Sequence, residues 1–198
     1  METILAILLG IGLSAACGFR VFVPLLGVSI AAMSGHLTLS PGFAWIGSPV
    51  ALVTFGLATA LEIAAYYIPW LDNLLDSIAT PAAVIAGIIA MASVVTGMSP
   101  FLTWTLAIIA GGGTAAIIQA GTVITRAAST ATTGGIGNPA VSTAELAGAA
   151  VGTLLALIVP VVTAAVVMLL CVWIAGKFIR RQRQRRRNAP PGVRLQLQ

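Results

Sequence analysis

Long apolar runs separated by short polar segments make up most of this chain, and proline marks their starts. Five times a residue that caps helices precedes proline: Ser40-Pro41, Ser48-Pro49, Thr80-Pro81, Ser99-Pro100 and Asn138-Pro139. A Ser, Thr or Asn N-cap followed by proline in the first turn is a strong helix-start signal. We therefore expect helices over residues 3–33, 49–68, 80–98, 101–127 and 141–176, joined by loops at 34–48, 69–79 and 128–140 and a short turn at 97–100.

Two of these expected helices are too long for one straight membrane span. At about 1.5 Å per residue, residues 3–33 and 141–176 measure roughly 46 to 54 Å, against a hydrocarbon core of roughly 30 Å. Each contains a proline, Pro24 or Pro160, so each is either tilted or broken. For the first we expect a break shortly before Pro24, because Arg20 lies there.

The composition places the chain in a bilayer. Of 198 residues, 59% are hydrophobic and 8% are charged, whereas about a quarter of a typical soluble domain is charged. These values exclude a soluble enzyme, a disordered protein and a disulfide-rich secreted domain. We expect an all-α, polytopic transmembrane helix bundle of five to six spans. Cys17 and Cys171 lie in apolar runs and are predicted to be packing residues.

The basic charge is local. Seven of the ten cations lie in residues 177–187: Lys177, Arg180, Arg181, Arg183, Arg185, Arg186 and Arg187. By the positive-inside rule this cluster places the C-terminus in the cytoplasm. We divide the chain into a transmembrane domain, 1–176, and a disordered tail, 177–198, in which Lys177, Arg180, Arg181 and Arg183 contact anionic lipid head groups rather than nucleic acid.

A weak internal repeat relates residues 1–100 to residues 101–176. Leu5-Ala6-Ile7-Leu8, Gly10 and Gly12 recur as Leu106-Ala107-Ile108-Ile109, Gly111 and Gly113, and each copy continues to an arginine, an X-Pro start and a glutamate. Two explanations remain open: a duplication, which predicts an inverted repeat as in many transporters, or chance similarity within an Ala-, Leu-, Ile- and Gly-rich sequence.

Two charges lie deep within apolar runs. Arg20 sits between Gly18 and Pro24, and Glu62 lies near the end of the expected helix 49–68. Such a charge costs about 2.5–3.5 kcal/mol on insertion scales, which an Arg20–Glu62 pair would offset in part. The pair either fixes helix register or lines a polar cavity that binds or relays something. A third alternative is that one side chain reaches an interface.

Two other acidic positions have simpler explanations. Ser142-x-x-Glu145 matches a capping box, so we expect Glu145 to cap a helix start. Residues 66–76 place Asp72, Asn73 and Asp76 opposite an apolar face. This pattern is typical of an interfacial helix, with a cation-binding vestibule as the alternative.

The segment after Arg126 is rich in hydroxyls and glycines. Convergent backbone N–H groups and a helix N-terminus attract anions, although an ordinary flexible loop has a similar composition. The candidate residues for binding phosphate, carboxylate or a lipid head group are Ser129, Thr130, Thr132, Thr133, Gly134 and Gly135. The segment lacks a P-loop lysine, which excludes a Walker-type nucleotide site.

Catalytic and metal-binding patterns are absent from the sequence. His36 is the sole histidine and has no neighbouring ligand, and no cluster of His, Cys and carboxylates has ligand spacing. No serine occupies a nucleophile elbow. We therefore expect neither an enzyme nor a cofactor.

Residues 14–22, 66–76 and 129–139 resemble an uncharacterised bacterial membrane-protein family, domain of unknown function 4126. The resemblance covers about residues 1–175 and leaves out the basic tail. It implies a multi-pass protein of the bacterial inner membrane and adds no catalytic residue.

Together these features predict a small transporter or channel-like protein for an anionic solute or lipid head group, using Arg20, Arg126 and Glu62. It would be a homodimer or part of a larger membrane complex. Gly111-Gly112-Gly113 and Gly148-x-x-x-Gly152 are expected to allow close helix packing. The alternative is a non-catalytic structural or accessory subunit, in which the charged pair only orders helices.

Overall fold

In the computed structural model, every regular element of the described chain is a helix. The structure describes the backbone of residues 2–67 and 69–188, and the side chains of residues 2–67, 78–177 and 180. The elements are α1 (Glu2–Cys17), α2 (Phe22–Met33), the 3₁₀ helix η1 (Pro41–Gly47), α3 (Pro49–Ala65), α4 (Pro69–Val94), α5 (Pro100–Leu106), the π-helical segment η2 (Ala107–Gly112), α6 (Gly113–Thr133), α7 (Asn138–Ile158) and α8 (Pro160–Asn188). The all-α prediction is confirmed.

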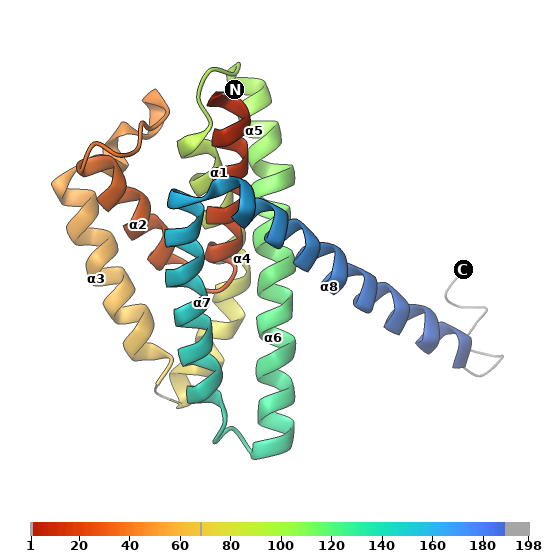
Figure 1. Cartoon of the computed structure of the whole chain (residues 1–198). Helices are drawn as coiled ribbons and strands as arrows, with labels where there is room; N and C mark the ends of the chain where they lie inside the picture. The colour runs from red at the N-terminus through yellow and green to blue at the C-terminus, as the bar shows by residue number, and fades with distance from the viewer. Residues whose placement is uncertain (1, 68, 189–198) are drawn as a thin grey trace.

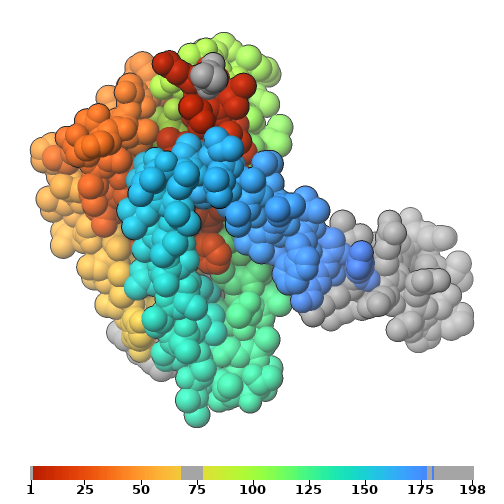
Figure 2. Space-filling model, viewed as in Figure 1, coloured from red at the N-terminus to blue at the C-terminus, as the bar shows by residue number. Residues whose placement is uncertain are grey.

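Helix α1 lies at the centre of the bundle. It packs against α4, α6, α7 and α8, while α2 and α3 pack on each other at one side (Figure 1). Helix α8 begins beside α7 and then extends away from the bundle past α6 (Figures 1 and 2). This arrangement places the break between α1 and α2 inside the molecule.

The helix starts follow the predicted caps in two places. The Ser48 hydroxyl accepts from the Ala51 N–H at 3.1 Å, and the Ser99 hydroxyl accepts from the Leu102 N–H at 3.4 Å. The start expected at Thr80-Pro81 is wrong, because Pro81 lies inside α4, and the loop expected at 69–79 is helical. Proline removes one helical N–H, but the residues on both sides can stay helical.

Both of the overlong runs are broken. The first is interrupted between Cys17 and Phe22, as predicted, and the second between Ile158 and Pro160. Gly18 is required at the first break, because a Cβ there would lie 2.6 Å from the Ile118 Cβ. Each break converts one long run into two helices.

The predicted loop 128–140 is mostly wrong. Helix α6 continues to Thr133, and only residues 134–137 separate it from α7. Gly134 ends α6 in the left-handed conformation, with φ of 63°, which glycine adopts at little cost. The short turn makes α6 and α7 an antiparallel hairpin.

Small residues bring η2 against α4. A Cβ on Gly111 would lie 2.7 Å from the Gly87 carbonyl oxygen, and one on Gly112 would lie 3.0 Å from Ile88. A Cβ on Gly148 would lie 3.7 Å from the Phe19 ring, and one on Gly152 would lie 3.7 Å from the Ala16 Cβ of α1, both ordinary contact distances. Close packing is thus confirmed at Gly111 and Gly112, whereas a side chain would fit at Gly148 and Gly152, and Gly113 faces open space.

The two cysteines are free thiols, as their apolar surroundings predicted. Cys17 is fully buried in the core beside Leu13, and Cys171 is half-buried. Cys17 packs in the cluster that also contains Leu25 and Val28. It therefore contributes to the contact between α1 and α2.

Three helical stretches are long and apolar enough to cross a membrane: Pro100–Thr133, Asn138–Ile158 and Pro160–Lys177. A fourth is reached if η1 and α3, which meet at 66°, form one bent span. Large apolar side chains point outward, such as Val50 at 76% and Phe101 at 77% exposure. These features are compatible with a membrane protein, but the expected five to six spans are not confirmed.

Candidate functional site: a buried arginine cluster

Two arginines meet inside the helix bundle. Arg20 lies in the break between α1 and α2 and is 2% exposed, while Arg126 lies on α6 and is 4% exposed. Gly18 allows α1 to end directly against α6, which brings the two side chains into one region. We call these two residues, with Tyr66, Ser142 and Glu145, the arginine cluster.

Glu145 on α7 binds both arginines. The Arg126 Nε donates to Glu145 Oε1 at 3.0 Å, and the Arg126 Nη2 donates to Glu145 Oε2. The Arg20 Nη2 lies 3.6 Å from the same Oε2. One buried carboxylate therefore serves two buried guanidinium groups.

The capping role expected for Glu145 is wrong. Because the turn before α7 is short, α7 already begins at Asn138, and Glu145 lies two turns inside the helix. Ser142, one turn earlier, also faces the arginines. Its carbonyl accepts from Arg20 Nη2 at 2.8 Å, and its hydroxyl accepts from Arg126 Nη2 at 3.2 Å.

Tyr66 provides an aromatic face for both guanidinium groups. It follows α3 and is buried, with its ring centroid 3.8 Å from Arg20 Cζ and 4.2 Å from Arg126 Cζ. The face of an aromatic ring attracts cations, and the effect grows when water is excluded. The ring thus offsets part of the cost of burying two positive charges.

Glu62 lies beside the cluster but binds backbone. Its Oε1 accepts from the Val21 N–H at 2.8 Å, and its Oε2 accepts from the Phe22 N–H at 3.1 Å. These N–H groups belong to the start of α2, where helical N–H groups lack intrahelical partners and a negative charge is favoured. Glu62 is therefore an N-terminal anchor for α2, and the predicted Arg20–Glu62 pairing is replaced by Arg20–Glu145.

Arg20 keeps two donors without partners. Its Nε and Nη1 are buried and have no hydrogen-bond partner among the described residues. Leaving buried donors unmatched is costly, especially on a charged group. Their presence beside a second arginine is the feature of this site that most favours an anionic ligand.

The predicted hydroxyl-rich anion cradle is mostly helical. Thr132 and Thr133 bond to the α6 carbonyls of Ala128 and Ser129, at 2.8 and 2.7 Å. In the turn, the N–H of Gly134 bonds to the Thr130 carbonyl at 2.9 Å. The two hydroxyls therefore bond within the last turns of α6, and the Gly134 N–H bonds to a carbonyl at the helix end, which lacks an intrahelical partner. Anion binding at Ser129, Thr130, Thr132, Thr133, Gly134 and Gly135 stays a prediction.

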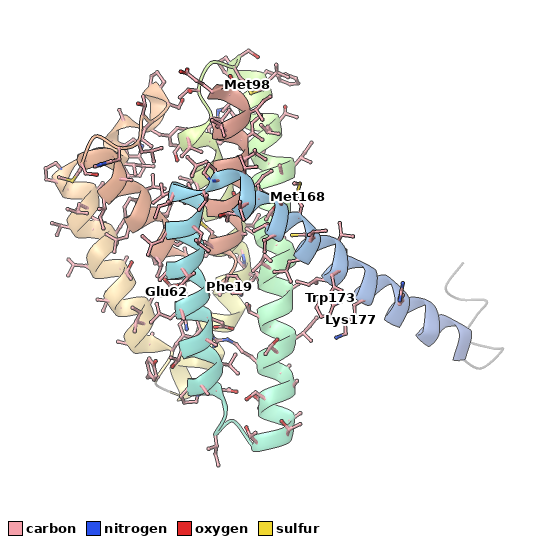
Figure 3. All side chains as sticks on the ribbon, viewed as in Figure 1. Phe19, Glu62, Met98, Met168, Trp173 and Lys177 are labelled. Carbon is pink, nitrogen blue, oxygen red and sulfur yellow. The ribbon has the colours of Figure 1, made fainter. Side chains whose placement is uncertain are left out.

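Other predicted positions are only partly described. The side chains of Asp72, Asn73, Asp76, Arg181 and Arg183 lie outside the described residues. Lys177 and Trp173 lie close together on α8 (Figure 3), with the Lys177 ammonium 4.7 Å from the Trp173 ring centroid. Arg180 is exposed. Within the described chain, no group of three or more His, Cys, Asp and Glu could hold a metal ion.

Sequence reasoning identified Arg20, Arg126 and Glu62 but missed Tyr66 and the ionic role of Glu145. One signal was present. Arg126 and Glu145 each lie nine positions from the central pair Gly135-Ile136, and residues equidistant from the turn of a helical hairpin lie side by side. Because residues 128–140 were predicted to be a loop, the two residues were not expected to face each other across a helical hairpin.

The fold and site define an all-helical protein with apolar helices long enough to cross a membrane and a buried ionic cluster at a helix break. The sequence model of the family described as domain of unknown function (DUF4126) matches residues 7–181. The chain belongs to this family, as the resemblance in the sequence indicated. No curated protein and no solved structure matches the chain.

Proposed function

We propose that this chain is a multi-pass inner-membrane protein, transporter or channel-like, that binds an anionic solute or lipid head group at the arginine cluster. The observation that carries the proposal is the pair of buried Arg20 donors, Nε and Nη1, without partners. An oxyanion accepts such hydrogen bonds, and bonds between charged groups are about twice as strong as neutral ones.

The charges around the cluster favour an anion. Arg20 and Arg126 share the carboxylate of Glu145, and the carboxylate of Glu62 is bound by two N–H groups of α2. Two guanidinium groups therefore lie close together in the protein interior. Guanidinium groups are well suited to buried recognition of carboxylate and phosphate.

The helix break lies next to Glu62 and contains Arg20. Arg20 lies in the non-helical segment between α1 and α2, and Glu62 binds the first N–H groups of α2. Transporters often place their ligand sites at such broken helices. Protonation of Glu62 would weaken its hold on α2, so we assign Glu62 the role of the coupling carboxylate.

We propose a membrane arrangement with five to six spans and a cytoplasmic C-terminus. We count the three long apolar stretches, the broken pair α1–α2 and the helical stretch Ile78–Val94 as five spans, and the bent pair η1–α3 as a sixth. The basic residues that follow the last apolar stretch favour a cytoplasmic C-terminus. We expect the functional unit to be a homodimer.

A flux assay tests this function. Purified protein in liposomes is expected to accelerate uptake of labelled inorganic phosphate, or transbilayer movement of fluorescent phosphatidylglycerol, relative to protein-free liposomes. Arg20→Ala should reduce the rate at least about tenfold, because a charged hydrogen bond is worth about 1.5–3 kcal/mol. Glu62→Gln should abolish the pH dependence of the flux, because glutamine cannot take up or release a proton.

The exposed Glu2 provides a matched control, and Glu2→Gln should leave the flux unchanged. Flux of both probes at the protein-free rate would overturn the transport function. Unchanged flux in both Arg20→Ala and Glu62→Gln would show that neither the arginine cluster nor Glu62 takes part in transport.

One observation favours the alternative of a structural or accessory subunit. Arg126 binds both oxygens of Glu145, an interaction that fixes α6 on α7 without any ligand. Purification from native membranes separates the two functions. A partner present in fixed stoichiometry favours the subunit, whereas a homo-oligomer active in flux favours the transporter.

A further inference from the structure

An apolar groove lies between α6, α7 and α8. Arg20, whose two donors lack partners, does not line this groove. Its volume is about 730 Å³, within the range of roughly 300–1,000 Å³ typical of ligand sites. Helix α8 forms one wall as it extends away from the bundle (Figure 2). Phe19, at the break after α1, lines the groove as well.

The walls match a hydrocarbon chain. Ile117, Ile118 and Ile124 come from α6, and Leu170 and Ile174 come from α8. Small residues at Ala116, Ala120 and Gly121 also line the groove. Because these side chains are short, they leave the space between the two helices open.

The charges of the groove match an anionic amphiphile. Lys177 lines it, and its ammonium lies against the Trp173 ring, which is also part of the wall. An amphipathic lysine and tryptophan of this kind are typical of a boundary between hydrocarbon and head groups. Arg180 follows one turn later and is exposed. The one acidic residue among the lining side chains, Glu145, is bound by Arg126.

We propose that this groove binds one acyl chain of an anionic diacyl phospholipid, whose phosphate lies at Lys177. The site does not depend on the anion-binding role of Arg20. It meets the arginine cluster at Glu145, which belongs to both. The occupant would fill the space between α8 and α6 and hold α8 in its orientation.

Native mass spectrometry of the full-length protein tests this site. The protein is released from nanodiscs that contain equal amounts of phosphatidylglycerol and phosphatidylcholine with identical chains. The expected result is one retained phosphatidylglycerol per chain. Equal retention of both lipids, or no retained lipid, would overturn the proposal.

Filling the groove should expel the lipid. A Cβ on Gly121 would lie 3.6 Å from Ile174 Cδ1, an ordinary contact, so Gly121→Leu extends into the groove without a backbone clash. It should lower retention about tenfold, and Ala120→Leu, at an exposed lining position, should do the same. Ala127→Leu is the matched control, because Ala127 is exposed on α6 outside the groove. Full retention in both lining variants would contradict the site.

The head-group contact has its own test. Lys177→Gln should lower the preference for phosphatidylglycerol about fivefold, which corresponds to about 1 kcal/mol. Lys177→Arg should keep the preference, since the charge remains. An unchanged preference in Lys177→Gln would overturn the assignment of the phosphate to Lys177. Loss of flux in Arg20→Ala with normal lipid retention would show that the two sites act independently.

Discussion

Replacement of Glu145 by glutamine is expected to lower the free energy of unfolding by about 3–5 kcal/mol, the cost of removing one partner from a buried ion pair. The substitution keeps the shape of the side chain but leaves Arg20 and Arg126 without the carboxylate that both contact. Titration with a denaturing detergent, followed by tryptophan fluorescence, measures the change.

Two comparisons separate this effect from a general loss of charge. Glu2→Gln makes the same chemical change at an exposed site and should alter stability by less than about 0.5 kcal/mol. Combining Glu145→Met with Arg126→Met should recover part of the loss, because the second substitution removes a buried guanidinium group that has lost its carboxylate partner Glu145. A Glu145→Gln protein as stable as the wild type would contradict the ionic role of Glu145.

Replacement of Glu62 by alanine is the second large expected effect. It leaves the N–H groups of Val21 and Phe22 without their acceptor, and hydrogen bonds to a charged group contribute about 1.5–3 kcal/mol. We expect a loss of about 3 kcal/mol in the free energy of unfolding. Glu62→Gln should lose roughly half as much, because its amide oxygen can accept one of the two bonds.

Hydrogen exchange locates this effect. In Glu62→Ala, the amides of Val21 and Phe22 should exchange much faster than in the wild-type protein, whereas amides in α6 should be little changed. Unchanged protection at the start of α2 would show that Glu62 does not anchor this helix.

The sequence predicted those parts of the fold that depend on local chemistry. Ser48-Pro49 and Ser99-Pro100 start helices because capping acts within one turn. The break at Arg20 was likewise predicted from adjacent residues. The continuation of α4 through Pro81 was not predicted from the sequence. Proline is compatible with both a helix start and an interior position, and neighbouring residues do not decide between them.

The sequence predicted three charged residues of the candidate site and its surroundings but not which residues they contact. A charge in an apolar run signals importance, and this signal identified Arg20, Glu62 and Arg126. Pairing depends on where helices end: the α6–α7 turn aligns Arg126 with Glu145, and α3 brings Tyr66 onto both arginines. Such alignment depends on loop length and tertiary packing, which one sequence does not specify.

Arg20 is expected to donate hydrogen bonds from its two partnerless donors, Nε and Nη1, to an anion. Crystals of the protein grown with selenate and measured at the selenium absorption edge would show such an anion. We expect an anomalous peak with selenate oxygens within about 3.2 Å of Arg20 Nε or Nη1, and loss of this peak in Arg20→Ala. Crystals with no such peak, in which both donors bond to protein groups or water, would contradict this expectation.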